Sequence, residues 1–252
     1  MTPTVFVSHG SPSLLLEPGA SREFLAGLGQ RLGRPKAIVC MSAHWETAEA
    51  GVGLAEHPDT IHDFYGFPPE MYRMRYPAPG DPALGQRILQ LLAAAGIASG
   101  GDPRRGFDHG VWSPLALMYP GADIPVVELS VQPRRSLAHH MAIGRALRPL
   151  RSDGILIMGS GSVTHNLREL GRNTPQAAAF EDWLIEAAVE GRDGDIAGAD
   201  TLAPHYRHNH PTPEHFLPLF APLGASHPGA KAEALNRIFD YGSLSMAALV
   251  WD

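Results

Sequence analysis

The chain has 252 residues, of which 44% are hydrophobic, and a formal net charge of −6 at pH 7. This length and hydrophobic content can bury a sizeable core, and the acidic balance argues against a nucleic-acid-binding surface. The single cysteine, Cys40, excludes an internal disulfide and indicates a reducing, cytoplasmic location. No apolar run approaches the ~20 residues that span a bilayer, so the sequence predicts no membrane insertion.

Apolar runs and turn residues alternate regularly along the chain. In chain order they predict a strand over Thr4–Ser8, a helix over Ser21–Leu32, strands over Ala37–Ser42 and Gly51–Ala55, a helix over Ala83–Ala95, a strand over Pro125–Val131, a helix over Arg135–Leu150, a strand over Gly154–Gly159 and a helix over Pro175–Glu190. The last predicted elements are a shorter helix over Pro213–Leu223 and a pair of strands at Ala232–Phe239 and Ser245–Val250. This alternation predicts one three-layer α/β domain over residues 1–252, with a mostly parallel central sheet flanked by helices.

Three of the apolar runs lead into histidines with small neighbours, namely His9, His44 and His165. In open α/β sheets ligands bind beyond the carboxyl ends of the strands, and imidazole is the commonest side-chain metal ligand. His9 and His44 therefore indicate two metal ligands. The alternative is two unrelated loop histidines that hydrogen-bond to backbone.

A third ligand is expected from a distant loop, residues 205–216, which holds four histidines and a glutamate. Because Pro213 can begin a helix, Glu214 and His215 are expected at a helix N-terminus, from which only one of them reaches a metal. Two histidines and a carboxylate would form the iron facial triad, whereas three histidines suit zinc or iron. The alternative is a surface cluster without a ligand.

Two further histidines are candidates for catalysis. His109 follows Asp108 and precedes an apolar segment, which suits a group that orients substrate or transfers a proton; the alternative is an incidental histidine beside a helix-capping Asp108. His165 follows a glycine-rich turn that lacks both the lysine of a P-loop and a Gly-x-Ser-x-Gly elbow, so an acid/base role is favoured. His139 and His140 are expected on a polar helix face, and Cys40 is expected to be a buried, inert thiol.

Taken together, these motifs resemble the DOPA 4,5-dioxygenase-like members of the class III (LigB-type) extradiol ring-cleaving dioxygenases. The resemblance runs to about residue 250 and rests on Ser8-His9-Gly10-Ser11-Pro12, Ser42-Ala43-His44-Trp45, Tyr65-Gly66-Phe67-Pro68-Pro69-Glu70-Met71-Tyr72, Asp108-His109-Gly110-Val111-Trp112, Thr164-His165-Asn166-Leu167 and His210-Pro211-x-x-Glu214-His215. The resemblance is specific for the family and not for the substrate.

The resemblance implies a single α/β domain with a mononuclear non-haem Fe(II), and zinc can occupy the same site. It implies His9, His44 and His215 as metal ligands, with Glu214 as the reserve for the third. It also implies His165 as the catalytic acid/base and His109 as the second active-site histidine.

The predicted activity is therefore cleavage of a catechol-type ring, DOPA or another small aromatic diol, with O₂ to a ring-opened semialdehyde. The alternatives are a zinc-dependent hydrolase that uses a metal-bound hydroxide and a non-catalytic metal-binding protein. A carboxylate-bearing substrate would need a cationic partner, for which Arg75, Arg168 and Arg207 are candidates. The pattern leaves the oligomeric state open and is compatible with a homo-oligomer.

Overall fold

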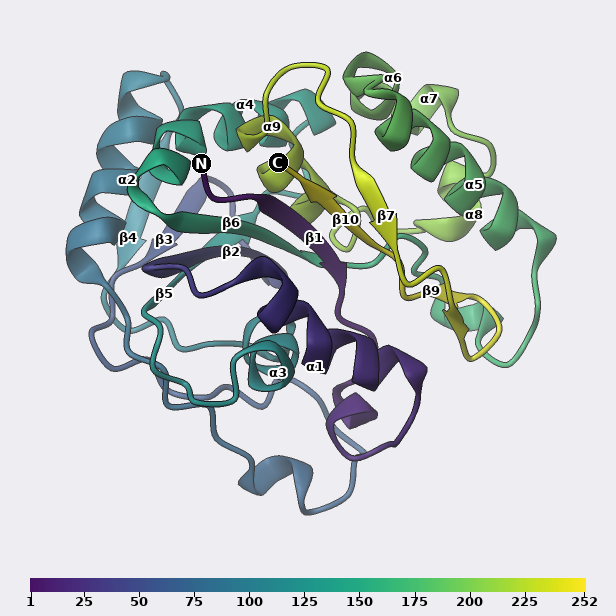
Figure 1. The fold of residues 1–252 in the computed structure, drawn as a ribbon, viewed down its shortest axis with the longest axis horizontal. Coiled ribbons are helices and arrows are strands. Elements are labelled where there is room, and N and C mark those ends of the chain that lie inside the picture. The colour runs from purple at the N-terminus through teal and green to yellow at the C-terminus, as the bar shows by residue number, and fades with distance from the viewer.

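The apolar runs form an eight-stranded sheet in the computed structural model, which describes residues 1–252 (Figure 1). Its strands are β1 (Thr4–Ser8), β2 (Ala37–Glu46), β3 (Ala50–Gly53), β4 (Ser99–Asp102), β5 (Val126–Val131), β6 (Ile155–Gly161), β7 (Glu233–Leu235) and β10 (Ala248–Trp251). The spatial order is β4-β3-β5-β2-β6-β1-β10-β7. The four central strands, β5, β2, β6 and β1, are mutually parallel, and antiparallel pairs occur toward both edges. β8 (Phe239–Asp240) and β9 (Leu244–Ser245) form a small separate sheet.

The central strands are buried on both faces, which explains why they are continuously apolar in sequence. Successive side chains of a strand point to opposite faces. In β2, Val39 and Met41 pack into the hydrophobic cluster on one face, whereas Ile38 and Cys40 pack into the cluster on the other. Each face of this sheet must therefore be covered by helices.

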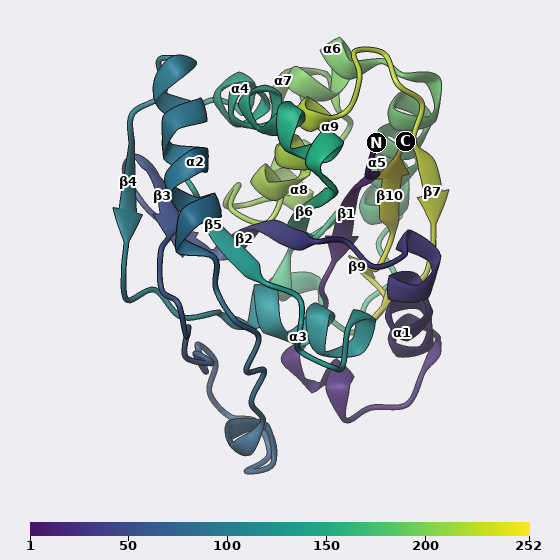
Figure 2. The same ribbon diagram turned by 60° about the vertical axis from the view of Figure 1, so that its left-hand side comes forward.

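The helices cover both faces of the sheet, as Figure 2 shows. α1 (Ala20–Leu32) and α3 (His109–Met118) lie on one face. The other face carries α2 (Pro82–Ala94), α4 (Leu137–Leu147), α5 (Pro175–Glu190) and α9 (Phe220–Ala225), with the short helices α6 (Asp193–Ala197), α7 (Ala199–Leu202) and α8 (Tyr206–Asn209) between the last two in sequence. The predicted three-layer α/β fold with a mostly parallel sheet is confirmed. None of the helices is long and apolar enough to cross a membrane.

Some predicted boundaries were wrong for identifiable reasons. The helix predicted from Pro213 begins only at Phe220, after turns and the 3-10 helix η5 (Leu217–Leu219), because Pro218 interrupts the helical hydrogen-bond ladder. The strand predicted over Ala232–Phe239 is divided into β7 and β8, since Asn236 adopts a left-handed conformation with φ of 51°. The edge strand β4 was not predicted because Ser99–Asp102 contains two glycines and no apolar run.

Candidate active site

The register of three adjacent strands brings His9 and His44 together. β6 lies between β2 and β1 and is parallel to both, so all three carboxyl ends reach the same edge of the sheet. His9 directly follows β1, and His44 lies near the end of β2. Their Nε2 atoms are 3.1 Å apart, although the residues are 35 positions apart in sequence. The two histidines predicted at strand ends thus lie side by side, although β6 separates their strands.

His215 reaches the same edge because its loop packs directly on the backbone of β6. The Ser162 amide donates a hydrogen bond to the His215 carbonyl over 2.9 Å. A Cβ added to Gly161 would lie only 2.1 Å from the same carbonyl oxygen, and one added to Gly159 would lie 2.1 Å from that of Pro218. The two glycines therefore allow the close approach that delivers His215.

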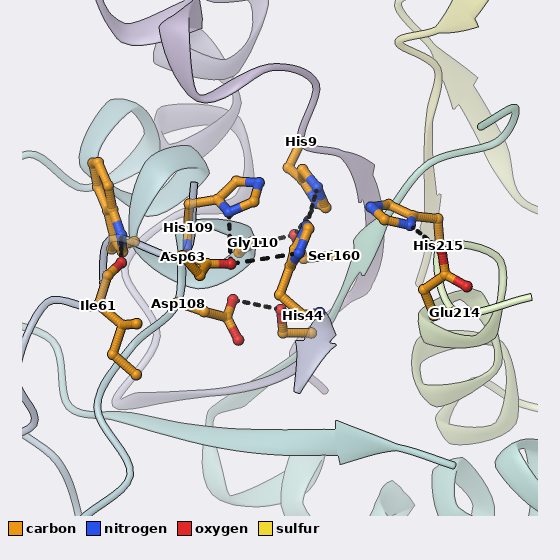
Figure 3. Close-up of polar contacts among 12 residues, drawn as sticks. His9, His44, Ile61, Asp63, Asp108, His109, Gly110, Ser160, Glu214 and His215 are labelled. Carbon is orange, nitrogen blue, oxygen red and sulfur yellow. Dashed lines mark hydrogen bonds and ion pairs between the residues drawn. The ribbon is translucent and has the colours of Figure 1, made fainter. Parts of the chain in front are cut away.

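His9, His44 and His215 together could hold one metal ion. One ring nitrogen of each lies within 4.8 Å of the others. The Nδ1 atoms of His9 and His215 contact Ser160 Oγ and Glu214 Oε1, each over 3.0 Å, and His44 Nδ1 lies 3.4 Å from Asp63 Oδ2 (Figure 3). In all three rings Nδ1 contacts a neighbouring oxygen, which leaves Nε2 as the ligand atom.

The contacts at Nδ1 favour one tautomer of each ring. The Glu214 carboxylate accepts at hydrogen-bond distance from His215 Nδ1, and the Asp63 carboxylate, 3.4 Å from His44 Nδ1, favours a proton on that nitrogen. Ser160 donates its own hydroxyl proton to the Gly110 carbonyl, and its oxygen therefore accepts from His9 Nδ1. With Nδ1 protonated in all three rings, three Nε2 lone pairs converge; the 3.1 Å contact between the Nε2 atoms of His9 and His44 also suits a hydrogen bond from one ring to the other. Convergence of the three lone pairs is favourable when a cation lies among them, so the residues fit a metal ion.

The protonation equilibria of the three rings agree with this assignment. Burial, followed by the neighbouring imidazoles, lowers the pKa of His9 and of His215 well below the usual value. Burial also lowers the pKa of His44 to about 4. The rings are therefore neutral at pH 7, which is the form that binds a metal.

Asp63 connects His44 to His109. One of its carboxylate oxygens accepts from the His109 backbone amide over 2.9 Å, and the other lies 2.8 Å from His109 Nδ1. Burial raises the pKa of Asp63, but the His109 hydrogen bonds outweigh burial and bring the pKa to about 2. A fixed negative charge therefore orients both imidazoles.

Asp108 supports the site and does not cap its helix through the side chain, so the capping alternative was wrong. It occupies the N-cap position of α3 but makes no side-chain cap hydrogen bond. It accepts instead from Ser42 Oγ over 2.6 Å and pairs with Arg105, which also binds Glu128 over 2.9 Å. Ser42 Oγ in turn accepts from the His44 amide over 3.2 Å, so this buried network holds the end of β2.

His165 lies beside His215. Its ring stacks on that of His215, with centroids 3.4 Å apart and planes 9° apart. Burial lowers its pKa to about 4, against the opposing effect of Glu214. His165 and His109 both line a cavity of about 420 Å³ that the three candidate ligands also line. This volume lies in the range of sites that bind small organic molecules, about 300–1,000 Å³.

The remaining candidate residues divide between this cavity and the core. The segment Pro58–Pro79 forms part of the cavity wall through Phe64 and Phe67. Cys40 is fully buried, as predicted, and burial raises the pKa of its thiol. His140 is also fully buried, so its predicted place on a polar helix face was wrong: its Nε2 accepts from the Gln132 amide over 3.0 Å.

Two residues that complete the centre were not predicted from sequence. Asp63 lies in the loop between β3 and α2, where no local pattern marks it as part of the centre, and Ser160 lies between two glycines that indicated only a tight turn. The loop at 205–216 is not a surface cluster, because His215 and His210 are buried. His210 Nε2 contacts the Val163 carbonyl over 2.8 Å and does not reach the centre.

Similarity to known proteins extends over nearly the whole chain. The family described as the catalytic LigB subunit of aromatic ring-opening dioxygenase matches residues 3–250. The chain belongs to this family. It is therefore an extradiol ring-opening dioxygenase. Family membership favours the predicted dioxygenase over the two alternatives, a zinc hydrolase and a non-catalytic metal-binding protein.

Individual relatives agree with the family assignment. The chain is 43% identical over 250 residues to a 4,5-DOPA dioxygenase extradiol of Beta vulgaris, with 96% of this chain and 93% of that protein covered. It is 40% identical over 257 residues to a protein of the same name from Escherichia coli strain K12, with coverages of 98% and 93%. A crystal structure of an uncharacterized Escherichia coli K12 protein superposes with a TM-score of 0.82 at 35% identity, and all of both chains is covered.

Proposed function

We propose that this protein is a non-haem Fe(II) enzyme that cleaves a catechol-type ring, DOPA or another small aromatic diol, with O₂ to give a ring-opened semialdehyde. The observation that carries the proposal is the convergence of three imidazoles, with one ring nitrogen of each within 4.8 Å of the others, in the wall of a cavity that is large enough for a substituted catechol. Family membership supplies the reaction class.

His9, His44 and His215 are the proposed ligands of the metal. Glu214, the reserve candidate, contacts His215 Nδ1 and is better placed to orient that ring than to replace it. A set of three neutral imidazoles accepts iron or zinc, so zinc bound in the same site is consistent with the proposal. When bound, Fe(II) supplies the redox chemistry with O₂ and acidifies a coordinated hydroxyl.

His165 is the proposed acid/base. Its ring is neutral at pH 7 and is held by stacking on His215, so it can accept a proton from a catechol hydroxyl and later return it. His109 is the proposed second active-site histidine. Because Asp63 fixes the proton on its Nδ1, His109 presents its Nε2 side to the cavity and can orient a substrate oxygen.

The proposal is tested by incubating the protein, reconstituted anaerobically with Fe²⁺, with L-DOPA and with 4-methylcatechol in air. We expect a yellow ring-opened product to form with one O₂ consumed per ring. His165→Ala should retain iron and lose at least about 100-fold in kcat, in line with general acid–base catalysis. No product from any catechol would refute the proposal, and near-normal turnover by His165→Ala would refute the acid/base role.

The proposed function also implies the domain organisation, the partners and the location of the protein. We propose that residues 1–252 act as one catalytic domain on a small aromatic diol and O₂, without nucleic acid or membrane as partner. The single buried cysteine supports a reducing, cytoplasmic location. A homo-oligomer is compatible with this function.

A further inference from the structure

The cavity has two chemically different ends. Its inner end is formed by the imidazoles of the candidate metal centre, together with His109 and His165. The rest of its wall consists mainly of large apolar or aromatic side chains. Phe64, whose ring centroid lies 5.8 Å from that of His109, Phe67 and Leu244 belong to this wall, and the solvent-exposed Leu167, Leu170 and Tyr241 form its outer part. A bare catechol bound at the inner end would leave most of this outer surface uncovered.

The mouth of the cavity exposes apolar side chains to solvent. Leu167, Leu170 and Tyr241 are 62%, 42% and 45% exposed, and all three line the cavity. A contiguous exposed apolar surface of this kind marks a place where a ligand or partner binds. Because this surface is continuous with the reaction centre, its occupant is expected to be the part of the substrate that extends away from the ring.

The charges around the mouth do not suit an anionic extension. None of the residues that line the cavity is a lysine or an arginine. The nearby acidic group is Glu17, which accepts from the Tyr241 hydroxyl over 3.2 Å. Arg75, one of the cations considered for a carboxylate, donates instead to the carbonyls of Tyr72 and Met74 over 2.9 and 2.8 Å. Arg168 and Arg207 are exposed and do not line the cavity.

We propose that the preferred substrate is a catechol with an uncharged, apolar substituent that extends from the metal centre to Leu167 and Leu170. This inference rests on the proposed catechol dioxygenase function and names the substrate class for that site. A carboxylate on the substituent would lie against apolar side chains, with no lysine or arginine among the residues that line the cavity, which disfavours its binding.

The experiment compares kcat/KM of the Fe²⁺-loaded enzyme for three catechols that differ only at position 4. They are 4-methylcatechol, 4-propylcatechol and 3,4-dihydroxyphenylpropanoate, in which a carboxylate replaces the terminal methyl of the propyl chain; L-DOPA is a fourth substrate. Each methylene that becomes fully buried raises kcat/KM about 4-fold. We therefore expect 4-propylcatechol to exceed both 4-methylcatechol and the propanoate by about 10-fold.

A double variant tests the position of the substituent. Leu167→Ser with Leu170→Ser should reduce the ratio of 4-propylcatechol to 4-methylcatechol by about 5-fold or more, because the apolar mouth is lost. Leu202→Ser is the matched control, since Leu202 is 57% exposed but lies outside the cavity, and it should keep the wild-type ratio.

The outcomes separate this inference from the proposed function. Cleavage of 4-methylcatechol with equal or higher kcat/KM for the propanoate or L-DOPA would overturn the substrate class and leave the dioxygenase intact. An unchanged ratio in the double variant would likewise overturn the assignment of the mouth. Failure to cleave every catechol would overturn the proposed function, and the inference with it.

Discussion

At the scale of residues, the centre is organised by what contacts the Nδ1 atoms. Ser160, Asp63 and Glu214 come from a strand, a loop and the turn before a 3-10 helix, and each fixes the orientation of one candidate ligand. Such outer contacts orient the ring and raise the basicity of the ligand atom. The metal site is therefore formed by the fold before any ion binds.

Removal of one ligand should abolish tight metal binding. His9→Ala or His44→Ala leaves two imidazoles, and we expect the affinity for Fe²⁺ to fall by more than the about 10–100-fold typical of outer-shell changes. His227→Ala is the control, because His227 is exposed. The check is the iron content of purified, reconstituted protein by elemental analysis. Wild-type iron content in either ligand variant would discard its assignment.

Asp63 offers a test of orientation without loss of a ligand. Asp63→Asn removes the negative charge beside His44 and His109, and we expect metal affinity to fall about 10–100-fold while the protein stays folded. Asp59→Asn is a matched control, since Asp59 lies in the same segment and is exposed. Competition with a chelating dye measures the affinity. Equal affinities for the two variants would show that Asp63 does not orient His44.

At the scale of elements, the site depends on close contact between β6 and the loop that carries His215. Gly159 and Gly161 have no side chain on the face that meets this loop, so carbonyl oxygens approach the strand directly. The strand thus sets the position of a ligand that lies more than 50 residues further along the chain.

A methyl group at this contact should disturb both stability and metal binding. In Gly161→Ala the new Cβ would lie 2.1 Å from the His215 carbonyl oxygen, so the loop must move. We expect a loss of about 1–3 kcal/mol, as for other overpacked sites, together with weaker metal binding. Gly100→Ala, where a Cβ meets nothing within 4 Å, should change stability by less than about 0.5 kcal/mol. Urea unfolding of both variants tests this; similar stabilities would contradict the packing argument.

The predictability of the elements follows from local signals. Strands such as β2 and β6 are apolar on both faces, so their runs were visible in sequence and their terminal histidines could be placed at one edge. The start of α9 after Pro213 and the polar edge strand β4 are not marked by an apolar run of this kind. Asp63 and Ser160 become significant only through contacts across 19 and 151 positions, which no local pattern encodes.

At the scale of the whole molecule, several ionisable groups are buried apart from the metal centre. His140 in α4 is the example with the best-defined partners, since its Nδ1 contacts the Ser136 carbonyl and its Nε2 accepts from the Gln132 amide, each over 3.0 Å. Burial lowers its pKa to about 4. The hydrogen bond from the Gln132 amide needs the neutral ring, because a protonated Nε2 cannot accept, whereas the bond to the Ser136 carbonyl is compatible with either form. Burial and the Gln132 contact therefore make the folded state resist protonation of His140.

The burial of His140 should make the folded state less stable in mild acid. Between pH 6.5 and about 4 the unfolded chain binds a proton at His140 that the folded chain does not, so stability is complete above pH 6.5 and falls as the pH decreases. From pH 7 to pH 5 the loss due to this residue is about 2 kcal/mol. Urea unfolding of His140→Gln should show a pH-dependent loss smaller by that amount. The same loss in the variant and the wild type would exclude His140 as a source.

The candidate ligands His9 and His44 lie directly after β1 and within β2, whereas irregular segments carry much of the apolar cavity wall. Phe64 and Phe67 belong to the long connection between β3 and α2, which extends away from the sheet in Figure 2, and Leu170 follows a short 3-10 helix. Insertions or exchanges in these segments leave the buried strands and their register untouched. Evolution could therefore redirect such an enzyme to a new aromatic compound, or engineers could graft a different rim, without rebuilding the reactive centre.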